Sequence, residues 1–257
     1  MRILFIGDIF GRPGREAVKK FLPEIKEQEQ IDFTIANGEN ARHGNGMDLD
    51  IYSDLTEAGV DYFTGGDHSF SIKEFLPLMD DPKTRVLRPA NYPGAPGRGL
   101  AIVEVGIENL TIINLQGRVF MRQQIDNPFL IADQLIKESK GFIFIDFHAE
   151  ATSEKNTFGH YVDGRVGAVV GTHTHVPTAD ERILPKGTAY ISDVGLTGPR
   201  NGSIGADLKQ VIPSFTKGLP FKLAPAEGET VLNAIVIETK DNQAISIKRV
   251  SIVDPKD

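Results

Sequence analysis

Short apolar runs that end in a glycine and a polar residue recur along the first quarter of the chain. They occupy residues 2–8, 32–40 and 60–68, which read RILFIGD, DFTIANGEN and VDYFTGGDH. The apolar, β-branched part of each run predicts a buried strand. The segments between them, 15–30 and 49–59, carry apolar residues on one side at helical spacing, so each predicts a helix. Three βα units in succession imply parallel strand pairing and right-handed crossovers.

Pro23 stands inside the first predicted helix. A proline removes a backbone donor and its ring clashes with the carbonyl four residues earlier. We therefore expect this helix to bend or to divide at Pro23.

The rest of the chain continues as strands and helices in a different order. Asn127 and Pro128 are typical of a helix start, with the asparagine as N-cap and the proline at the first helical position. The other expected elements are adjacent strands at 100–106 and 110–117, apolar strands at 142–150 and 167–175, a short helix after Gly205, and a hairpin over 231–253 that turns at KDNQ. We expect one α/β domain over residues 1–257, with mixed sheets.

Charge and composition narrow the function classes. The net charge is -7 and the chain contains no cysteine. A protein this acidic lacks the electrostatic footprint for long nucleic acids, and without cysteine it has no disulfides, thiolate nucleophiles or thiolate metal ligands. No stretch has the apolar length of a signal peptide core or of a membrane span. We expect a cytoplasmic protein with no membrane partner, whose metal ligands, if any, are nitrogen and oxygen.

Five polar clusters follow the predicted strands directly. They are Asp8, Glu39, Asp67 with His68, His148, and His173 with His175. Open α/β sheets bind ligands in the crevice beyond the carboxyl ends of their strands. Side chains far apart in the sequence are therefore expected to meet at one edge of the fold.

The segment GTHTH gives the sharpest single signal for a metal. On an extended segment the side chains of His173 and His175 point the same way. Imidazoles combined with carboxylates suit manganese, zinc or iron better than magnesium or calcium. The clusters offer more ligands than one tetrahedral ion needs, which indicates two ions. Two ions a few ångströms apart can clamp a phosphoryl group and activate a bridging water.

The sequence is compatible with three roles for Asp67. This residue can coordinate a metal, orient His68, or cap a helix that begins after it.

The ordered blocks GD, GEN, GGDH, DFHAE and GTHTH resemble those of the calcineurin-like metallophosphoesterases. Longer blocks, among them MRILFIGDIFGRPGR, FTIANGEN, DFHAEATSEK and VVGTHTHVPTADERILPKGTAYISDVGLTGP, resemble the bacterial YmdB-type branch over nearly the whole chain. The resemblance implies a four-layer α/β/β/α sandwich and a dinuclear centre, often containing iron, with manganese or zinc as alternatives. It also implies hydrolysis of small phosphodiesters, with 2′,3′- and 3′,5′-cyclic nucleotides as substrates, and it makes a homo-oligomer a fair expectation.

The resemblance also carries residue roles onto this sequence. One ion would be held by Asp8, Glu39, Asn40 and His175, and the other by Glu39, Asp67, His148 and His173. Glu39 would bridge the ions, a metal-bridging hydroxide would attack phosphorus, and His68 would be the proton donor.

Two positions depart from the superfamily pattern. Phe10 stands where the first block usually has a histidine, so Asn40 would complete the ligand set through its side-chain oxygen. Asp67 stands where the family has asparagine.

Two other functions fit parts of the same pattern. A nucleotide-sensing regulatory protein with vestigial catalysis is compatible with the substitution at Asp67. A mononuclear hydrolase of amides or esters would use His173 and His175 as a metal pair. Minor candidates are Arg98 and Arg118 for phosphate, Glu150 and Thr174 as partners that orient histidines, and Phe70 or Tyr92 for stacking on a base.

The Asp67→Asn variant tests whether this residue touches the metals. A third carboxylate beside Asp8 and Glu39 should hold the ions more tightly and raise the pKa of the bridging water. We expect Asp67→Asn to loosen metal binding and to shift the alkaline pH optimum of hydrolysis downward. Unchanged metal content together with an unchanged pH profile would show that Asp67 is not a ligand.

Overall fold

Two mixed sheets form the centre of the molecule. The computed structural model describes residues 1–220 and 222–255. The first six-stranded sheet contains β10 (Gly198–Pro199), β11 (Thr230–Lys240), β1 (Arg2–Ile6), β2 (Phe33–Asn37) and β3 (Tyr62–Thr64) in that order, with β12 (Gln243–Asp254) paired to β11. The second has the order β4 (Leu100–Val105), β5 (Glu108–Gln116), β6 (Phe142–His148), β7 (Ala168–Thr172), β9 (Ala189–Ile191) and β8 (Arg182–Ile183).

Parallel strands occupy the middle of both sheets. In the first sheet β1 pairs with β2 and β2 with β3 in parallel, as the βα units predict. In the second, β5, β6, β7 and β9 are parallel neighbours, while β4 and β8 are antiparallel edges. The carboxyl ends of the parallel strands therefore gather along one edge of each sheet.

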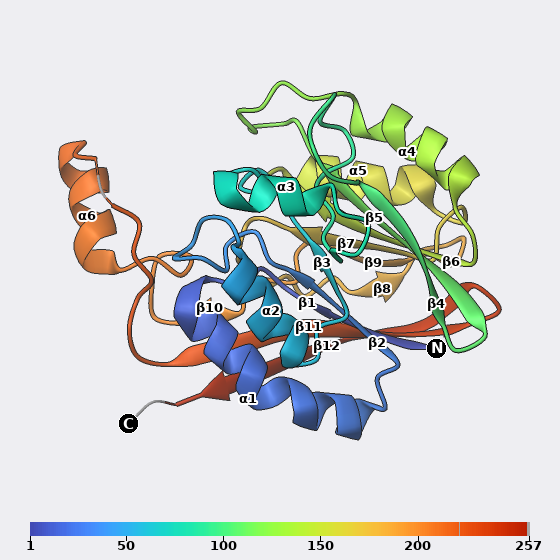
Figure 1. The fold of residues 1–257 in the computed structure, drawn as a ribbon, viewed down its shortest axis with the longest axis horizontal. Helices are drawn as coiled ribbons and strands as arrows, with labels where there is room; N and C mark the ends of the chain where they lie inside the picture. Colours follow the sequence, from blue (N-terminus) through green and yellow to red (C-terminus); the bar gives the residue numbers. More distant parts are fainter. Residues whose placement is uncertain (221, 256–257) are drawn as a thin grey trace.

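Helices cover the outer face of each sheet, so the fold has the expected four layers (Figure 1). The helices are α1 (Gly11–Glu29), α2 (Leu49–Glu57), α3 (Leu76–Met79), α4 (Pro128–Glu138), α5 (Thr152–Val162) and α6 (Leu208–Lys217), with a 3₁₀ turn at Lys73–Phe75. Buried side chains of α1 and α2 pack on the first sheet, and those of α4 and α5 pack on the second. A third apolar cluster lies between the sheets, where Phe5 and Phe144 approach to 5.3 Å between ring centroids.

Several local predictions are confirmed and others are incomplete. Asn127 caps α4 by accepting a hydrogen bond from the Phe129 amide, and the hairpin turns at Asp241 and Asn242, both with positive φ. Helix α1 runs continuously through Pro23, so the helix does not divide there, and a bend at Pro23 stays a prediction. Helix α5 follows β6 without having been anticipated.

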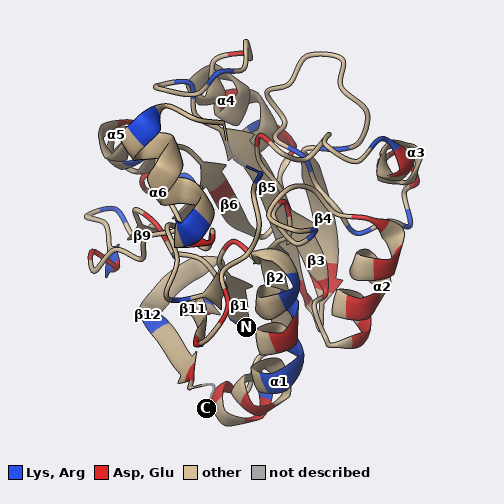
Figure 2. Cartoon of the chain, turned by 90° about the vertical axis from the view of Figure 1, so that its left-hand side faces the viewer, with Lys and Arg blue, Asp and Glu red and all other residues tan. Residues whose placement is uncertain are grey.

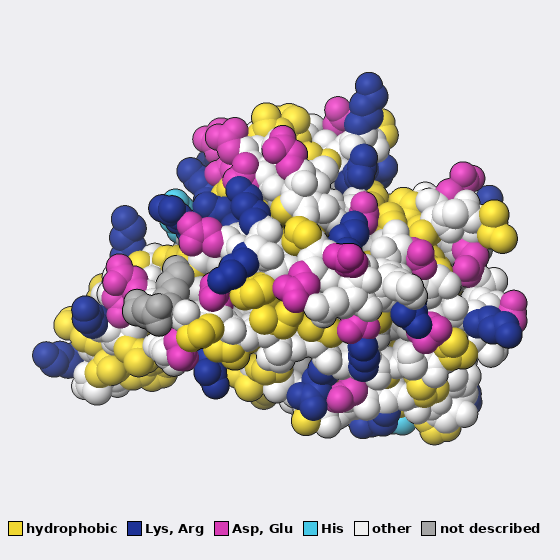
Figure 3. Space-filling model, turned by 90° about the horizontal axis from the view of Figure 1, so that it is seen from below, with side chains coloured by type: hydrophobic (Ala, Val, Ile, Leu, Met, Phe, Trp, Pro, Cys, Tyr) yellow, Lys and Arg dark blue, Asp and Glu magenta, His cyan; other side chains and the backbone are white. Residues whose placement is uncertain are grey.

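The surface is mixed in charge. Exposed acidic residues line α2, whereas α1 carries both signs (Figure 2). On the face in Figure 3 basic and acidic side chains are interspersed. Helix α6 projects from one end and exposes an apolar stripe that includes Ile212 and Phe215. Among the described residues, no helix has both the length and the apolar character needed to cross a membrane.

Candidate metal centre

The space between the two sheets changes from apolar to polar at the carboxyl ends of the strands. Side chains alternate between the two faces of a strand. In β6, Phe142 and Phe144 belong to the core between the sheets, so Asp146 and His148 continue the same face. The same alternation places Asn37 of β2, Thr64 of β3, Asn114 of β5 and Thr172 of β7 at this level.

Asp146 joins the two sheets through side-chain hydrogen bonds. Its carboxylate accepts from Asn37 Nδ2 at 3.1 Å and from the Thr64 hydroxyl, both on the first sheet. It also accepts from Thr172 Oγ1 at 2.7 Å, on the second sheet. The side chain is fully buried, and this desolvation raises the pKa of Asp146 to about 7. Three donors are thus committed to one carboxylate behind the candidate site.

Asn114 adds a second link between the sheets. Its amide oxygen accepts from the Gly65 backbone at 2.9 Å, and its amide nitrogen donates to the Gly65 carbonyl at 3.0 Å. Both atoms of the Asn114 amide therefore hold the start of the turn that carries Asp67 and His68.

Four sequence-predicted residues converge on one point in front of this link. One ligand atom from each of Glu39, Asp67, His148 and His173 lies within 4.8 Å of the others. His148 Nε2 is 3.1 Å from Glu39 Oε1, 3.2 Å from Asp67 Oδ1 and 3.0 Å from His173 Nδ1. Glu39 and Asp67 follow strands of the first sheet, whereas the two histidines lie at the ends of strands of the second, so the cluster spans both sheets.

A second set lies beside the first and shares Glu39. His175 Nε2 is 3.2 Å from Asn40 Nδ2 and 3.8 Å from Asp8 Oδ1, and Asn40 Nδ2 is 3.3 Å from Glu39 Oε1. Turning the Asn40 amide about its last side-chain bond exchanges its nitrogen for its oxygen, a ligand atom. All of these side chains are buried.

Hydrogen bonds leave the inner nitrogen of each histidine free for a metal. His175 Nδ1 donates to the Ile204 carbonyl at 2.8 Å. Thr172 donates to Asp146, so it accepts from His148 Nδ1 at 2.9 Å. His173 Nε2 lies 3.1 Å from Glu150 Oε2. Such outer partners fix the tautomer and orientation of a ligating histidine.

The electrostatics favour a bound cation. Burial opposes charge on Glu39, Asp67 and His148 alike, but their mutual attraction outweighs it. The pKa values of Glu39 and Asp67 are therefore lowered, and the pKa of His148 is raised. At Asp8 burial outweighs the nearby histidines, so its pKa is raised. The carboxylates thus create a field that holds a positive charge even in a dry site.

Two further observations show that the residues fit metal ions. Asp8 Oδ1 is buried and has no hydrogen-bond partner among the described residues, so one carboxylate oxygen is left for a ligand. A Cβ added at Gly66 would overlap the His148 ring and Glu39 Oε2, so a side chain there would fill the space where the ligand atoms meet. Nitrogen and oxygen donors of this kind suit iron, manganese or zinc.

His68 lies at the rim of the cluster. Its side chain is 38% exposed, and its Nδ1 is 3.0 Å from Asn40 Oδ1. Burial lowers the pKa of His68, but Glu39 and Asp67 outweigh it, so the pKa is raised. No helix begins at Asp67, which rules out the cap role.

The extended backbone expected at His173 and His175 is wrong, although both side chains reach the candidate site. Strand β7 ends at Thr172, and the two histidines have φ values of 98° and 65°. Positive φ is uncommon for a residue other than glycine. The two side chains therefore reach the site from a strained loop, each joining a different ligand set.

A buried ion pair supports this loop. Lys155 of α5 donates to Asp193 Oδ2 at 2.7 Å and to the Thr172 carbonyl at 2.8 Å. The same oxygen accepts from the backbone and hydroxyl of Thr174, at 3.1 Å and 2.8 Å. Thr174 therefore binds Asp193 and orients no histidine, whereas Glu150 does, as expected.

Three of the remaining minor candidates, Arg98, Phe70 and Tyr92, have structural partners. Arg98 donates to the carbonyls of Pro82 and Thr84. Phe70 and Tyr92 pack edge to face with ring centroids 5.1 Å apart, and Tyr92 donates to Gln116. Arg118 is exposed.

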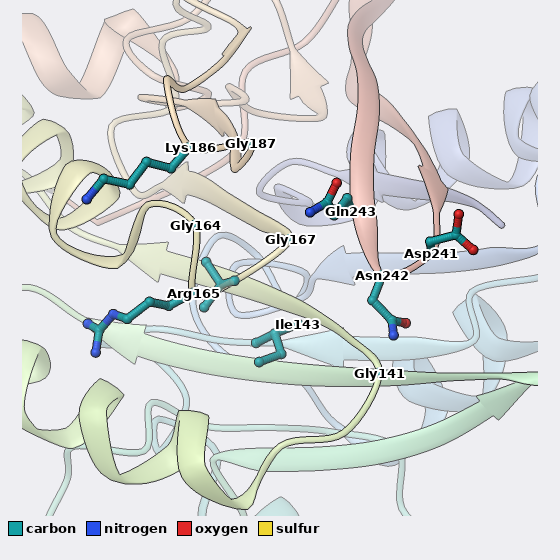
Figure 4. A pocket seen from close by; sticks show the side chains of 11 residues that line it. Gly141, Ile143, Gly164, Arg165, Gly167, Lys186, Gly187, Asp241, Asn242 and Gln243 are labelled. Atoms are coloured by element: carbon teal, nitrogen blue, oxygen red, sulfur yellow. The ribbon is translucent and has the colours of Figure 1, made fainter.

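A hollow of about 280 Å³ lies at the opposite edge of the second sheet, at the amino ends of strands β6, β7 and β9 (Figure 4). Arg165 and Lys186 extend from it in the same direction, away from the hairpin turn at Asn242. Arg165 forms an ion pair with Asp133 at 2.7 Å. This hollow contains no convergent set of metal ligands among the described residues.

Comparison with known proteins places these residues in context. A family model described as YmdB-like protein matches residues 4–250. A 2′,3′-cyclic-nucleotide 2′-phosphodiesterase of Bacillus subtilis is 51% identical over 99% of this chain and 98% of its own length. The crystal structure of a phosphatase from Mycoplasma pneumoniae has a TM-score of 0.94 at 37% identity, covering 99% of this chain and 94% of that chain.

A more distant structure supports the fold. A calcineurin-like phosphoesterase of Bacillus subtilis superposes with a TM-score of 0.53 at 11% identity, over 99% of this chain and 90% of that chain. The fold class expected from the sequence is confirmed.

Thr172→Val tests the outer partner of His148. The substitution keeps the shape of the side chain but removes the acceptor for Nδ1, so we expect affinity for Mn²⁺ to fall roughly 10- to 100-fold. Calorimetric titration of metal-free protein measures it. Thr34→Val is the matched control, because the Thr34 hydroxyl is buried and has no hydrogen-bond partner among the described residues. Equal affinities in both variants would contradict the role of Thr172.

Proposed function

This chain belongs to the YmdB-like family, and from that premise we propose that it is a dinuclear metal-dependent phosphodiesterase of small cyclic nucleotides. The proposed substrates are 2′,3′-cyclic nucleotides first, in line with the 51% identical relative, and 3′,5′-cyclic nucleotides as well. Its relatives and its calcineurin-like fold make it a phosphoric ester hydrolase by class.

The observation that carries the proposal is the pair of ligand sets that share Glu39. Asp8, Asn40 and His175 form one side, and Asp67, His148 and His173 form the other. The unpartnered Asp8 oxygen and the space kept open by Gly66 support occupation by ions. Ions held there would activate water and neutralise charge on the phosphoryl oxygens. We propose iron as the native metal, with manganese or zinc as substitutes.

His68 is the proposed proton donor to the leaving ribose oxygen. It is the histidine of the site with its side chain at the rim, next to the ligands and open to a substrate. Glu39 Oε1 lies 3.5 Å from its Nδ1, and its Nε2 lies 3.9 Å from Asp67 Oδ2. We assign the transferred proton to Nε2, because Nδ1 faces the buried carboxylate of Glu39. Glu39 and Asp67 raise its pKa against the effect of burial, which is the direction that favours the proton a general acid must carry.

The turn around His68 also fixes its position relative to the ligands. The His68 amide donates to Glu39 Oε2 at 3.0 Å, and the Gly66 amide donates to the Ser69 hydroxyl at 3.0 Å. A proton donor must lie within hydrogen-bond reach of the leaving atom, and a rigid turn maintains that geometry.

Other expectations stay predictions. They are the single domain over residues 1–257, the cytoplasmic location and the homo-oligomer. The nucleotide-sensing alternative predicts that the protein binds a cyclic nucleotide without hydrolysing it. Turnover in the assay below would therefore exclude this alternative.

The decisive assay compares His68→Ala with the wild type after loading with Mn²⁺. Loss of a general acid lowers kcat roughly 10²- to 10⁴-fold. We expect a fall of this size for adenosine 2′,3′-cyclic phosphate, with metal content unchanged. His160→Ala is the control, because His160 is exposed in the last turn of α5. Lack of turnover by metal-loaded wild type would refute the proposed function. Equal turnover by His68→Ala and wild type would refute the role of His68.

A further inference from the structure

A hollow of about 370 Å³ opens directly beside the candidate metal centre. One wall consists of the site residues Asp67, His68 and His173. The other consists of residues 120–123, which follow β5. We call residues 117–123 the β5 loop. A substrate whose phosphate lies at the ligand sets would extend past His68 into this space or into the hollow on the other side.

Phe120 is the aromatic side chain of the β5 loop, and it is 85% exposed. Its backbone has φ 64°, a conformation that bulky residues rarely adopt. An exposed phenylalanine in a strained backbone contributes little to the core, and such outliers persist where the surrounding structure holds them.

Buried groups hold the β5 loop in place from both ends. The Glu154 side chain of α5 is buried and accepts from the backbone amides of Arg118 and Val119, each at 3.0 Å. Gln123 accepts from Gln116 Nε2 at 3.1 Å and its own amide lies 3.5 Å from Asp67 Oδ2. The loop that carries Phe120 is therefore held on both sides of this residue, and Gln123 connects it to the proposed ligand Asp67.

The hollow on the other side of His68 has a different character. It measures about 450 Å³, and among the described residues that line it the exposed apolar side chains are the aliphatic Val176 and Ile204. Phe10 also lines it, but Phe10 is buried, with its ring edge to face against His175 and packed closely by Gly44 and Gly205. No face of that ring is free for another aromatic group.

We propose that Phe120 is the base-stacking residue of a nucleoside subsite, in which the base of the cyclic nucleotide lies on the Phe120 ring. The inference rests on the proposed phosphodiesterase function and deepens it. Stacking on an aromatic side chain accepts every base, because each base has a π face. The subsite therefore selects nucleotides over cyclic phosphates that lack a base, with weak preference among bases.

The test compares two esters, adenosine 2′,3′-cyclic phosphate and glycerol 1,2-cyclic phosphate, which has no base. The measured quantity is the ratio of kcat/KM for the nucleotide to that for the glycerol ester. For Phe120→Ala we expect this ratio to fall about tenfold or more, through a higher KM for the nucleotide. Phe120→Trp should keep the ratio near the wild-type value.

Phe215→Ala is the matched control, since Phe215 on α6 is 86% exposed and lies outside both hollows. An unchanged ratio in Phe120→Ala, or an equal loss on both esters, overturns the inference. So does a fall in the ratio in Ile204→Ala that is absent from Phe120→Ala. If metal-loaded wild type hydrolyses neither ester, the proposed function fails, and the inference fails with it.

Discussion

The buried carboxylate of Asp146 connects the two sheets at the edge where the candidate site lies. It accepts from Asn37 and Thr64 on one side and from Thr172 on the other. A buried carboxylate without partners costs several kcal/mol, so these donors are committed to it and the sheets are held at one separation. Because Glu39 and Asp67 follow strands of the first sheet and His148 and His173 those of the second, the geometry of the ligand sets depends on this link.

The linked sheets carry two features that need support, a group of buried carboxylates and a loop with a strained backbone. The ligand sets bring three carboxylates together in a largely buried space, which is stable only with positive charge among them. The histidines of the GTHTH segment have positive φ, and the Lys155–Asp193 pair beneath them holds the loop. In a buried pair of this kind, removal of one partner leaves an uncompensated charge, so the loop and helix α5 are coupled.

The sequence predicted which residues would meet but not how they are held. Asp8, Glu39 and His148 follow apolar strands, and the carboxyl ends of parallel strands necessarily come together. Asp146 alternates with Phe142 and Phe144, so the sequence shows that it shares their face of the strand. The sequence does not show which residues donate hydrogen bonds to it, and its role therefore could not be predicted. Lys155 and Asp193 are far apart in the sequence and lie on segments with weak periodicity. The positive φ values of His173 and His175 could not be predicted, because GTHTH follows the apolar run directly and contains no residue that marks the end of the strand.

We propose that the link between the sheets assembles two ion sites that share Glu39. Anomalous diffraction from crystals of the protein loaded with Mn²⁺ tests it most directly. We expect two peaks, one between Asp8, Asn40 and His175 and one between Asp67, His148 and His173, with Glu39 in contact with both. A single peak, or two peaks whose ligands all come from one sheet, would contradict it.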